Sequence, residues 1–165
     1  MNIETHVIKV GIADLNIVKS PNHIRTSGLG SCVGLIIFDK HNELAGLAHI
    51  MLPDSSLANK GSFNQAKYAD TAIPLLIHRL TMAGARSRAL LAKMAGGAQM
   101  FQFQNTNDMM RIGPRNIEAI KKQLHEYNIP LISEDVGGNS GRTIEFDPVS
   151  CELTIRTVNK GTKVI

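Results

Sequence analysis

The stretch from Val33 to Phe38 is an uninterrupted apolar run of strand length, and it constrains the fold more than any other feature of the chain. A strand with one face in water alternates apolar and polar residues, so an unbroken run is typical of a strand covered on both faces. The turn-like residues 39–42 follow it, and a second apolar segment runs from Ala45 to Pro53. We therefore expect a core built around a hairpin of two buried strands.

Other segments are expected to cover this hairpin. The apolar runs and alternating patterns predict further strands over residues 5–10, 24–27, 89–94, 131–135, 142–146 and 152–158. Apolar residues at helical spacing predict one helix between Ala66 and Leu80, kinked or delayed by Pro74, and a second helix that begins at Pro114. Residues 99–110 permit no assignment. The sum is a single α+β domain over residues 1–165, with a mixed or antiparallel sheet core and at least two packed helices.

Composition excludes several classes of protein. A hydrophobic fraction of 43% and a charged fraction of 19% are ordinary for a folded domain of 165 residues. The net charge is +4, but the basic residues are scattered and the chain has no Trp and two Tyr, so no nucleic-acid partner is expected. A mild positive charge instead favours an acidic protein partner.

The location expected from the sequence is the cytoplasm. No segment resembles a secretory signal, and no apolar run approaches membrane-spanning length, so membrane insertion is not expected. In a reducing compartment Cys32 and Cys151 should be free thiols. The six histidines show no close ligand spacing, so neither a metal nor another cofactor is expected.

The best candidate for chemistry is Cys32, which lies where a glycine-rich loop enters the first buried strand. A thiol is a poor nucleophile until a base takes its proton, and His49 lies near the far end of the neighbouring strand. Gly28, Gly30 and Gly34 leave room for a substrate carbonyl to approach the sulfur. We expect His49 to lower the pKa of Cys32, and backbone amides near Gly30 and Ser31 are candidates for stabilising an oxyanion.

The residues alone leave other readings open. A dinucleotide loop is excluded, because Val33 stands where the third glycine is required and a strand follows instead of a helix. A buried structural thiol remains as plausible for Cys32 as a catalytic one. Cys151 is expected to be structural. Phe101 and Phe103 are either core residues or an exposed docking patch for a partner.

Six short blocks of sequence, in order between residues 26 and 142, resemble the CheD family of chemoreceptor glutamine deamidases in bacterial and archaeal chemotaxis. The blocks are Gly-Leu-Gly-Ser-Cys32-Val, residues 48–54, Lys67-Tyr-Ala-Asp70, residues 95–101, Ile112-Gly-Pro-Arg-Asn116 and residues 134–139. The resemblance implies a layered α/β/α sandwich similar to the catalytic domain of cytotoxic necrotizing factor toxins. It also implies that Cys32 is the nucleophile, His49 the base and Thr26 the residue that orients His49.

The implied activity is that of a protein-glutamine glutaminase, which converts receptor glutamine to glutamate through a cysteine thioester and needs no cofactor. The implied partners are methyl-accepting receptors, at their cytoplasmic domains, and CheC, a phosphatase of the response regulator CheY. We expect CheC to compete with the receptor for the active-site mouth and to contact Phe101. Two alternatives stay open: a binding module that mainly activates receptors, and a cysteine protease.

Overall fold

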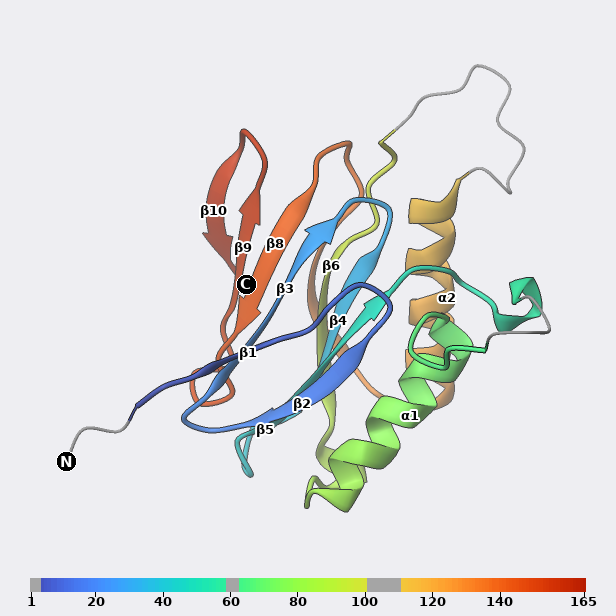
Figure 1. The fold of residues 1–165 in the computed structure, drawn as a ribbon. Helices are drawn as coiled ribbons and strands as arrows, with labels where there is room; N and C mark the ends of the chain where they lie inside the picture. Colours follow the sequence, from blue (N-terminus) through green and yellow to red (C-terminus); the bar gives the residue numbers. More distant parts are fainter. Residues whose placement is uncertain (1–3, 59–62, 101–110) are drawn as a thin grey trace.

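The structure is a computed structural model that describes residues 4–58, 63–100 and 111–165, in which the strands form two five-stranded sheets (Figure 1). The first sheet has the order β1-β3-β8-β9-β10. Its strands are β1 (Val7–Lys9), β3 (His23–Leu29), β8 (Arg142–Phe146), β9 (Leu153–Thr157) and β10 (Gly161–Val164). The second has the order β2-β5-β4-β6-β7. Its strands are β2 (Leu15–Lys19), β5 (Leu44–Ile50), β4 (Val33–Asp39), β6 (Leu91–Gly96) and β7 (Leu131–Val136).

The predicted hairpin of buried strands is confirmed as β4 and β5. The two strands pair antiparallel from Val33↔Ile50 to Asp39↔Leu44, and every residue of both is buried. At the turn, the buried carboxylate of Asp39 accepts hydrogen bonds from the side chain of Asn42 (2.7 Å) and from the backbone of Arg86 (2.9 Å). These bonds satisfy a charge that would otherwise be costly to bury.

The molecule has three layers, and the order of the layers corrects one prediction. Helices α1 (Ala69–Met82) and α2 (Ile112–Glu126) contact strands of the second sheet, and an apolar core fills the space between them. A second core lies between the two sheets. Figure 1 shows both helices on one side of this pair of sheets. The α+β class is confirmed and both sheets are mixed, but the α/β/α order is wrong: the described residues form β/β/α layers.

Two strands, β2 and β10, were not predicted from the sequence, for physical reasons. β2 is a five-residue edge strand, and all four residues of β10 are exposed, so neither carries a long apolar or alternating pattern. Helix α1 begins at Ala69 and continues through Pro74. Among the described residues, no helix is both long and apolar enough to cross a bilayer.

Candidate active site

An irregularity in β3 places Thr26. Between Thr26 and Leu29 the pairing of β3 with β8 shifts register, and Gly28 adopts a left-handed φ of 73° at this point. A bulge of this kind bends the strand and re-aims nearby side chains, and glycine adopts the left-handed conformation at little cost. The Thr26 side chain lies buried, with the residue 2% exposed.

Hydrogen bonds of Thr26 fix the tautomer of His49. The Thr26 hydroxyl lies 2.7 Å from the carbonyl oxygen of Val10 and 2.8 Å from Nδ1 of His49. A carbonyl can only accept and a hydroxyl has one proton, so Thr26 donates to Val10 and must accept from an Nδ1–H. The second ring nitrogen, Nε2, therefore carries the lone pair. It is buried and has no hydrogen-bond partner within the described ranges, which leaves it available as a base.

The register of the hairpin puts Cys32 and His49 on one face. His49 lies directly opposite Gly34, and Cys32 precedes Gly34 by two residues, so the two side chains are diagonal neighbours in the layer between the sheets. Gly34 is buried, and a Cβ there would lie 2.5 Å from Cδ1 of Ile144. The predicted role of Gly34 in substrate access is thus replaced by a packing role: it lets the first sheet approach the hairpin beside His49.

Burial governs the charge state of both groups. It raises the pKa of the Cys32 thiol, an effect that the residue's own backbone N–H partly offsets, and it lowers the pKa of His49. Burial of each group therefore favours the neutral thiol and the neutral imidazole. The expectation that His49 lowers the pKa of Cys32 opposes this effect of burial and stays a prediction. His49 is fully buried and Cys32 is partly exposed, so a reagent reaches the pair from the side of the sulfur.

Backbone contacts hold the loop that carries Cys32. The carbonyl of Cys32 accepts from the N–H of Gly97 (2.9 Å), and that of Gly30 accepts from Ala98 (2.8 Å). The N–H of Gly30 already donates to Gly28 (3.1 Å), which removes Gly30 from the candidate oxyanion donors. The amides of Ser31 and Cys32 remain, because neither has a backbone acceptor in the part of the chain that the structure describes.

Two buried polar residues that sequence reasoning gave no role lie beside this loop. Asn116 donates to the carbonyl of Ser31 (3.0 Å), and Arg142 donates to the carbonyl of Gly96 (3.2 Å). The sequence did hold a signal for Asn116, because it stands one helical turn before Ile120 on the apolar face of α2. A buried amide on such a face needs hydrogen-bond partners.

The other predicted residues have simpler outcomes. Cys151 is buried beside the carbonyl of Pro148, consistent with a structural thiol. Phe101 and Phe103 lie outside the described residues. Within residues 4–58, 63–100 and 111–165, no three His, Cys, Asp or Glu side chains are arranged to hold a metal ion.

Comparison with known proteins identifies the relatives of the chain. Residues 51–157 match a family model described as CheD chemotactic sensory transduction. That match begins after His49, so it does not include Thr26, Cys32 or His49. The curated relatives, in contrast, align over nearly the whole chain.

Three of these relatives are each named chemoreceptor glutamine deamidase CheD. The protein of Bacillus subtilis (strain 168) is 61% identical over 162 residues, which is 98% of both chains. The protein of Bacillus velezensis is 60% identical over the same length and coverage. The protein of Halalkalibacterium halodurans is 60% identical over 159 residues, or 96% of this chain and 98% of the relative.

Proposed function

The chain belongs to the CheD family, and we propose that it hydrolyses the side-chain amide of glutamine residues in chemoreceptors. Cys32 is the nucleophile, His49 the base and Thr26 the residue that orients the imidazole. The observation that carries this proposal is the buried Nε2 of His49, on the strand that pairs with β4. The hydrogen bond between the Thr26 hydroxyl and Nδ1 of His49 leaves the lone pair of Nε2 free.

The first half of the reaction acylates the enzyme. Nε2 of His49 takes the thiol proton as Sγ of Cys32 attacks the carboxamide carbon, because a thiolate is a far better nucleophile than a thiol. The amides of Ser31 and Cys32 stabilise the negative oxygen of the tetrahedral intermediate. The imidazolium then returns its proton to the amide nitrogen. The C–N bond breaks, ammonia leaves, and a thioester joins Cys32 to the substrate.

The second half restores the enzyme. Nε2 takes a proton from water, the hydroxide attacks the thioester carbon, and the C–S bond breaks. The sulfur recovers its proton from the imidazolium, and the substrate leaves as glutamate. Each turnover consumes one water, releases one ammonia and creates one negative charge on the receptor. The proton that His49 takes from the thiol is the one that the departing ammonia receives.

Intact-mass analysis of a receptor cytoplasmic fragment tests the proposal. Deamidation adds about one dalton and leaves the chain whole, whereas a cysteine protease would cut it. We expect wild-type protein and Cys151→Ala to release ammonia and Cys32→Ala to release none, with all three folded. Residual turnover of Cys32→Ala near the wild-type level would remove Cys32 from the role of nucleophile.

A second function, activation of receptors by binding alone, is the alternative that the family raises. A receptor–kinase assay that compares Cys32→Ala with wild type separates the two, because a binding module retains its effect without the sulfur. The location proposed for either function is the cytoplasm, at the receptors. The likeness to cytotoxic necrotizing factor toxins also stays a prediction.

CheC is the proposed regulatory partner, and it competes with the receptor for the mouth beside Cys32. Phe101→Glu should weaken CheC binding by placing an unpaired charge in a desolvated contact. The argument for Phe101 and Phe103 comes from the sequence, because residues 101–110 lie outside the described ranges. Saturating CheC should inhibit deamidation; full CheC binding with unchanged receptor turnover would separate the two surfaces.

A further inference from the structure

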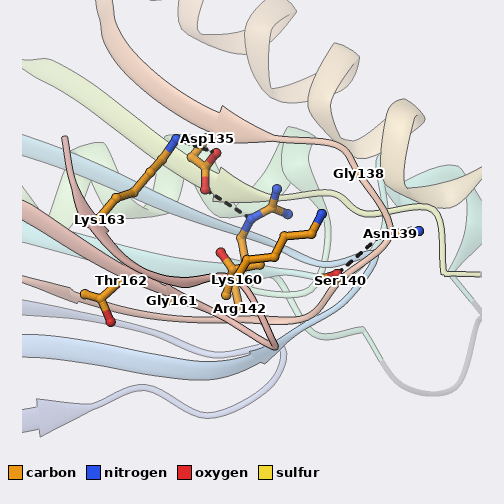
Figure 2. A pocket seen from close by; sticks show the side chains of 10 residues that line it. Asp135, Gly138, Asn139, Ser140, Arg142, Lys160, Gly161, Thr162 and Lys163 are labelled. Atoms are coloured by element: carbon orange, nitrogen blue, oxygen red, sulfur yellow. Dashed lines mark hydrogen bonds and ion pairs between the residues drawn. The ribbon is translucent and has the colours of Figure 1, made fainter.

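A cavity of about 240 Å³ lies beside the turn that supports Cys32. The β7–β8 loop, the β9–β10 hairpin and the start of β8 line it, and Figure 2 shows the side chains that surround it. Two hydrogen bonds connect it to the nucleophile: Arg142 donates to the carbonyl of Gly96 (3.2 Å), and the next residue, Gly97, donates to the carbonyl of Cys32 (2.9 Å). The wall of this cavity therefore contacts the backbone that supports Cys32.

Three cations and one carboxylate give the cavity its charge. Arg142 is buried and donates to Asp135 (3.3 Å) and to the carbonyls of Gly96 and Gly137 (2.9 Å for Gly137). Lys163 lies 3.0 Å from the other oxygen of Asp135. One carboxylate thus faces two cations, and the cavity is positive before its third cation is considered.

The third cation is Lys160, in the turn between β9 and β10. In the described part of the chain its ammonium group has neither an ion-pair nor a hydrogen-bond partner, and the residue is exposed. Figure 2 shows its side chain extending past Arg142 toward the loop of Gly138 and Asn139. An unpaired ammonium at the rim of a positive cavity is an attractive contact for a carboxylate.

We propose that this cavity binds an acidic side chain, Asp or Glu, of the protein substrate near the glutamine that is hydrolysed. The proposal rests on the proposed function, because it assigns a specificity contact to the same reaction. Lys160 supplies the direct charge contact, whereas Arg142 and Asp135 form the fixed wall. Such a contact acts on substrate binding and leaves the chemical step unchanged, so it affects KM and not kcat.

Charge reversal at Lys160 tests the contact. Lys160→Glu should raise KM for a receptor cytoplasmic fragment about three- to tenfold at low salt, with kcat unchanged, and should weaken the dependence of KM on ionic strength. Lys40→Glu is the matched control: it makes the same change of charge at an exposed turn at the opposite end of β4 from Cys32. Its KM should stay within about twofold of wild type, since at that distance the charge is largely screened.

Two outcomes would overturn the subsite. One is an unchanged KM in Lys160→Glu, and the other is an equal rise in Lys160→Glu and Lys40→Glu, which would indicate a general effect of net charge. Both require an active wild-type protein. A wild-type protein that releases no ammonia from any receptor fragment would instead refute the proposed function, so the two failures are distinguishable.

A separate observation concerns Asn116, which is 0% exposed on the inner face of α2. Its Nδ2 donates both to the carbonyl of Ser31 (3.0 Å) and to the carbonyl of Met51 (2.9 Å). Ser31 immediately precedes Cys32, and Met51 follows His49 by two residues. One amide group therefore holds the backbone just before β4 and just after β5, next to the two reacting side chains.

The position of Asn116 is significant because the β4–β5 ladder ends before it. The last pair of the ladder is Val33↔Ile50, so the pairing stops before Cys32 and Met51, which the same register would place opposite each other. Asn116 bridges Ser31 and Met51 just beyond the end of the ladder. Its N-terminal neighbour on α2, Gly113, packs so closely that a Cβ there would collide with the carbonyl of Ala98. The helix is thereby held against the loop that supports Cys32.

From this geometry we infer that Asn116 is a positioning residue that fixes the separation of Cys32 from His49. Without its two donors, the loop before β4 and the end of β5 can drift apart, and the carbonyls of Ser31 and Met51 are left unpaired. A displacement of about 1 Å between reacting groups can lower a rate about a hundredfold. The effect is on geometry, so it falls on kcat and on the reactivity of the thiol.

Alkylation of Cys32 against pH reports the pairing without requiring any deamidation. In a Cys151→Ala background, the profile of Asn116→Ala should shift toward that of His49→Ala, and kcat should fall about 10- to 100-fold with KM little changed. Adding Asn116→Ala to His49→Ala should produce no further change in alkylation. Ile120→Ala, one turn further along the same buried face, should lower stability and keep the wild-type profile.

A wild-type alkylation profile in Asn116→Ala would overturn the inference, as would an equal shift in Ile120→Ala. Should Asn116→Ala fail to fold, Asn116→Ser, whose hydroxyl can make one of the two bonds, is measured in the same way. A wild-type profile in that variant counts equally against the positioning role.

Discussion

Replacing Thr26 by valine tests the tautomer argument most directly. Valine keeps the branched shape of threonine and removes the hydroxyl, which is the only group described that contacts both His49 Nδ1 and the Val10 carbonyl. Both of these polar groups then stay buried without a partner. The substitution therefore affects the stability of the fold and the working form of the base at once.

The size of each effect follows from the contacts. A buried polar group left unpaired costs about 1–3 kcal/mol, so two such groups should lower the free energy of unfolding by about 2–6 kcal/mol. A hydrogen bond that biases the tautomer by about 1.4 kcal/mol corresponds to a factor of ten in the ratio of the two forms. Because kcat follows the fraction of His49 with a free Nε2 lone pair, we expect kcat for receptor deamidation to fall by up to about tenfold, and by less than in His49→Ala, which removes the base itself.

Thr26→Ser is the matched control, because it keeps the hydroxyl and loses only a methyl group. Its turnover should stay near wild type, with a small loss of stability from packing. Urea unfolding measures the stability of each variant, ammonia release measures turnover, and the nitrogen chemical shifts of the His49 ring report the tautomer. Turnover of Thr26→Val within about twofold of wild type, with unchanged ring-nitrogen shifts, would refute the reasoning.

Three further predictions concern stability. Burial lowers the pKa of His49, so the stability that its neutral form contributes is present above a pH of about 6.5 and is lost as pH falls through the lower folded pKa. The free energy of unfolding of His49→Gln, measured between pH 5 and 7, should lack this dependence. Burial raises the pKa of Asp39, but hydrogen bonds from Arg86 and Asn42 outweigh it and hold the pKa at about 2. Asp39→Ala should therefore lower the free energy of unfolding by about 2–4 kcal/mol at neutral pH without changing the alkylation of Cys32, because the lost bonds are confined to the turn. Altered alkylation would contradict this. Gly34→Ala should destabilise by about 1–3 kcal/mol and slow turnover, because its Cβ overlaps Ile144 beside His49; full activity and stability would contradict the packing role.

The sequence by itself determined the hairpin that carries the site. The unbroken apolar run of β4 requires cover on both faces, and this alone predicted two buried strands joined by a turn. Once the strands pair, Cys32 and His49 share a face because side chains alternate along a strand. The placement of the proposed nucleophile and base on one face was therefore predictable from local pattern, and the family resemblance supplied Thr26.

The tertiary structure alone decided the surroundings of Cys32 and His49. Thr26 reaches His49 only because a bulge in β3 and the packing of one sheet on the other bring them together, and both depend on contacts between segments far apart in the sequence. The same is true of the β/β/α order and of Asn116, whose two bonds join a helix to the segments just before β4 and just after β5. Local periodicity records which face of an element is buried, but not which element buries it. For that reason the effect of burial on the pKa of Cys32, which it raises, and of His49, which it lowers, could be known only from the assembled fold.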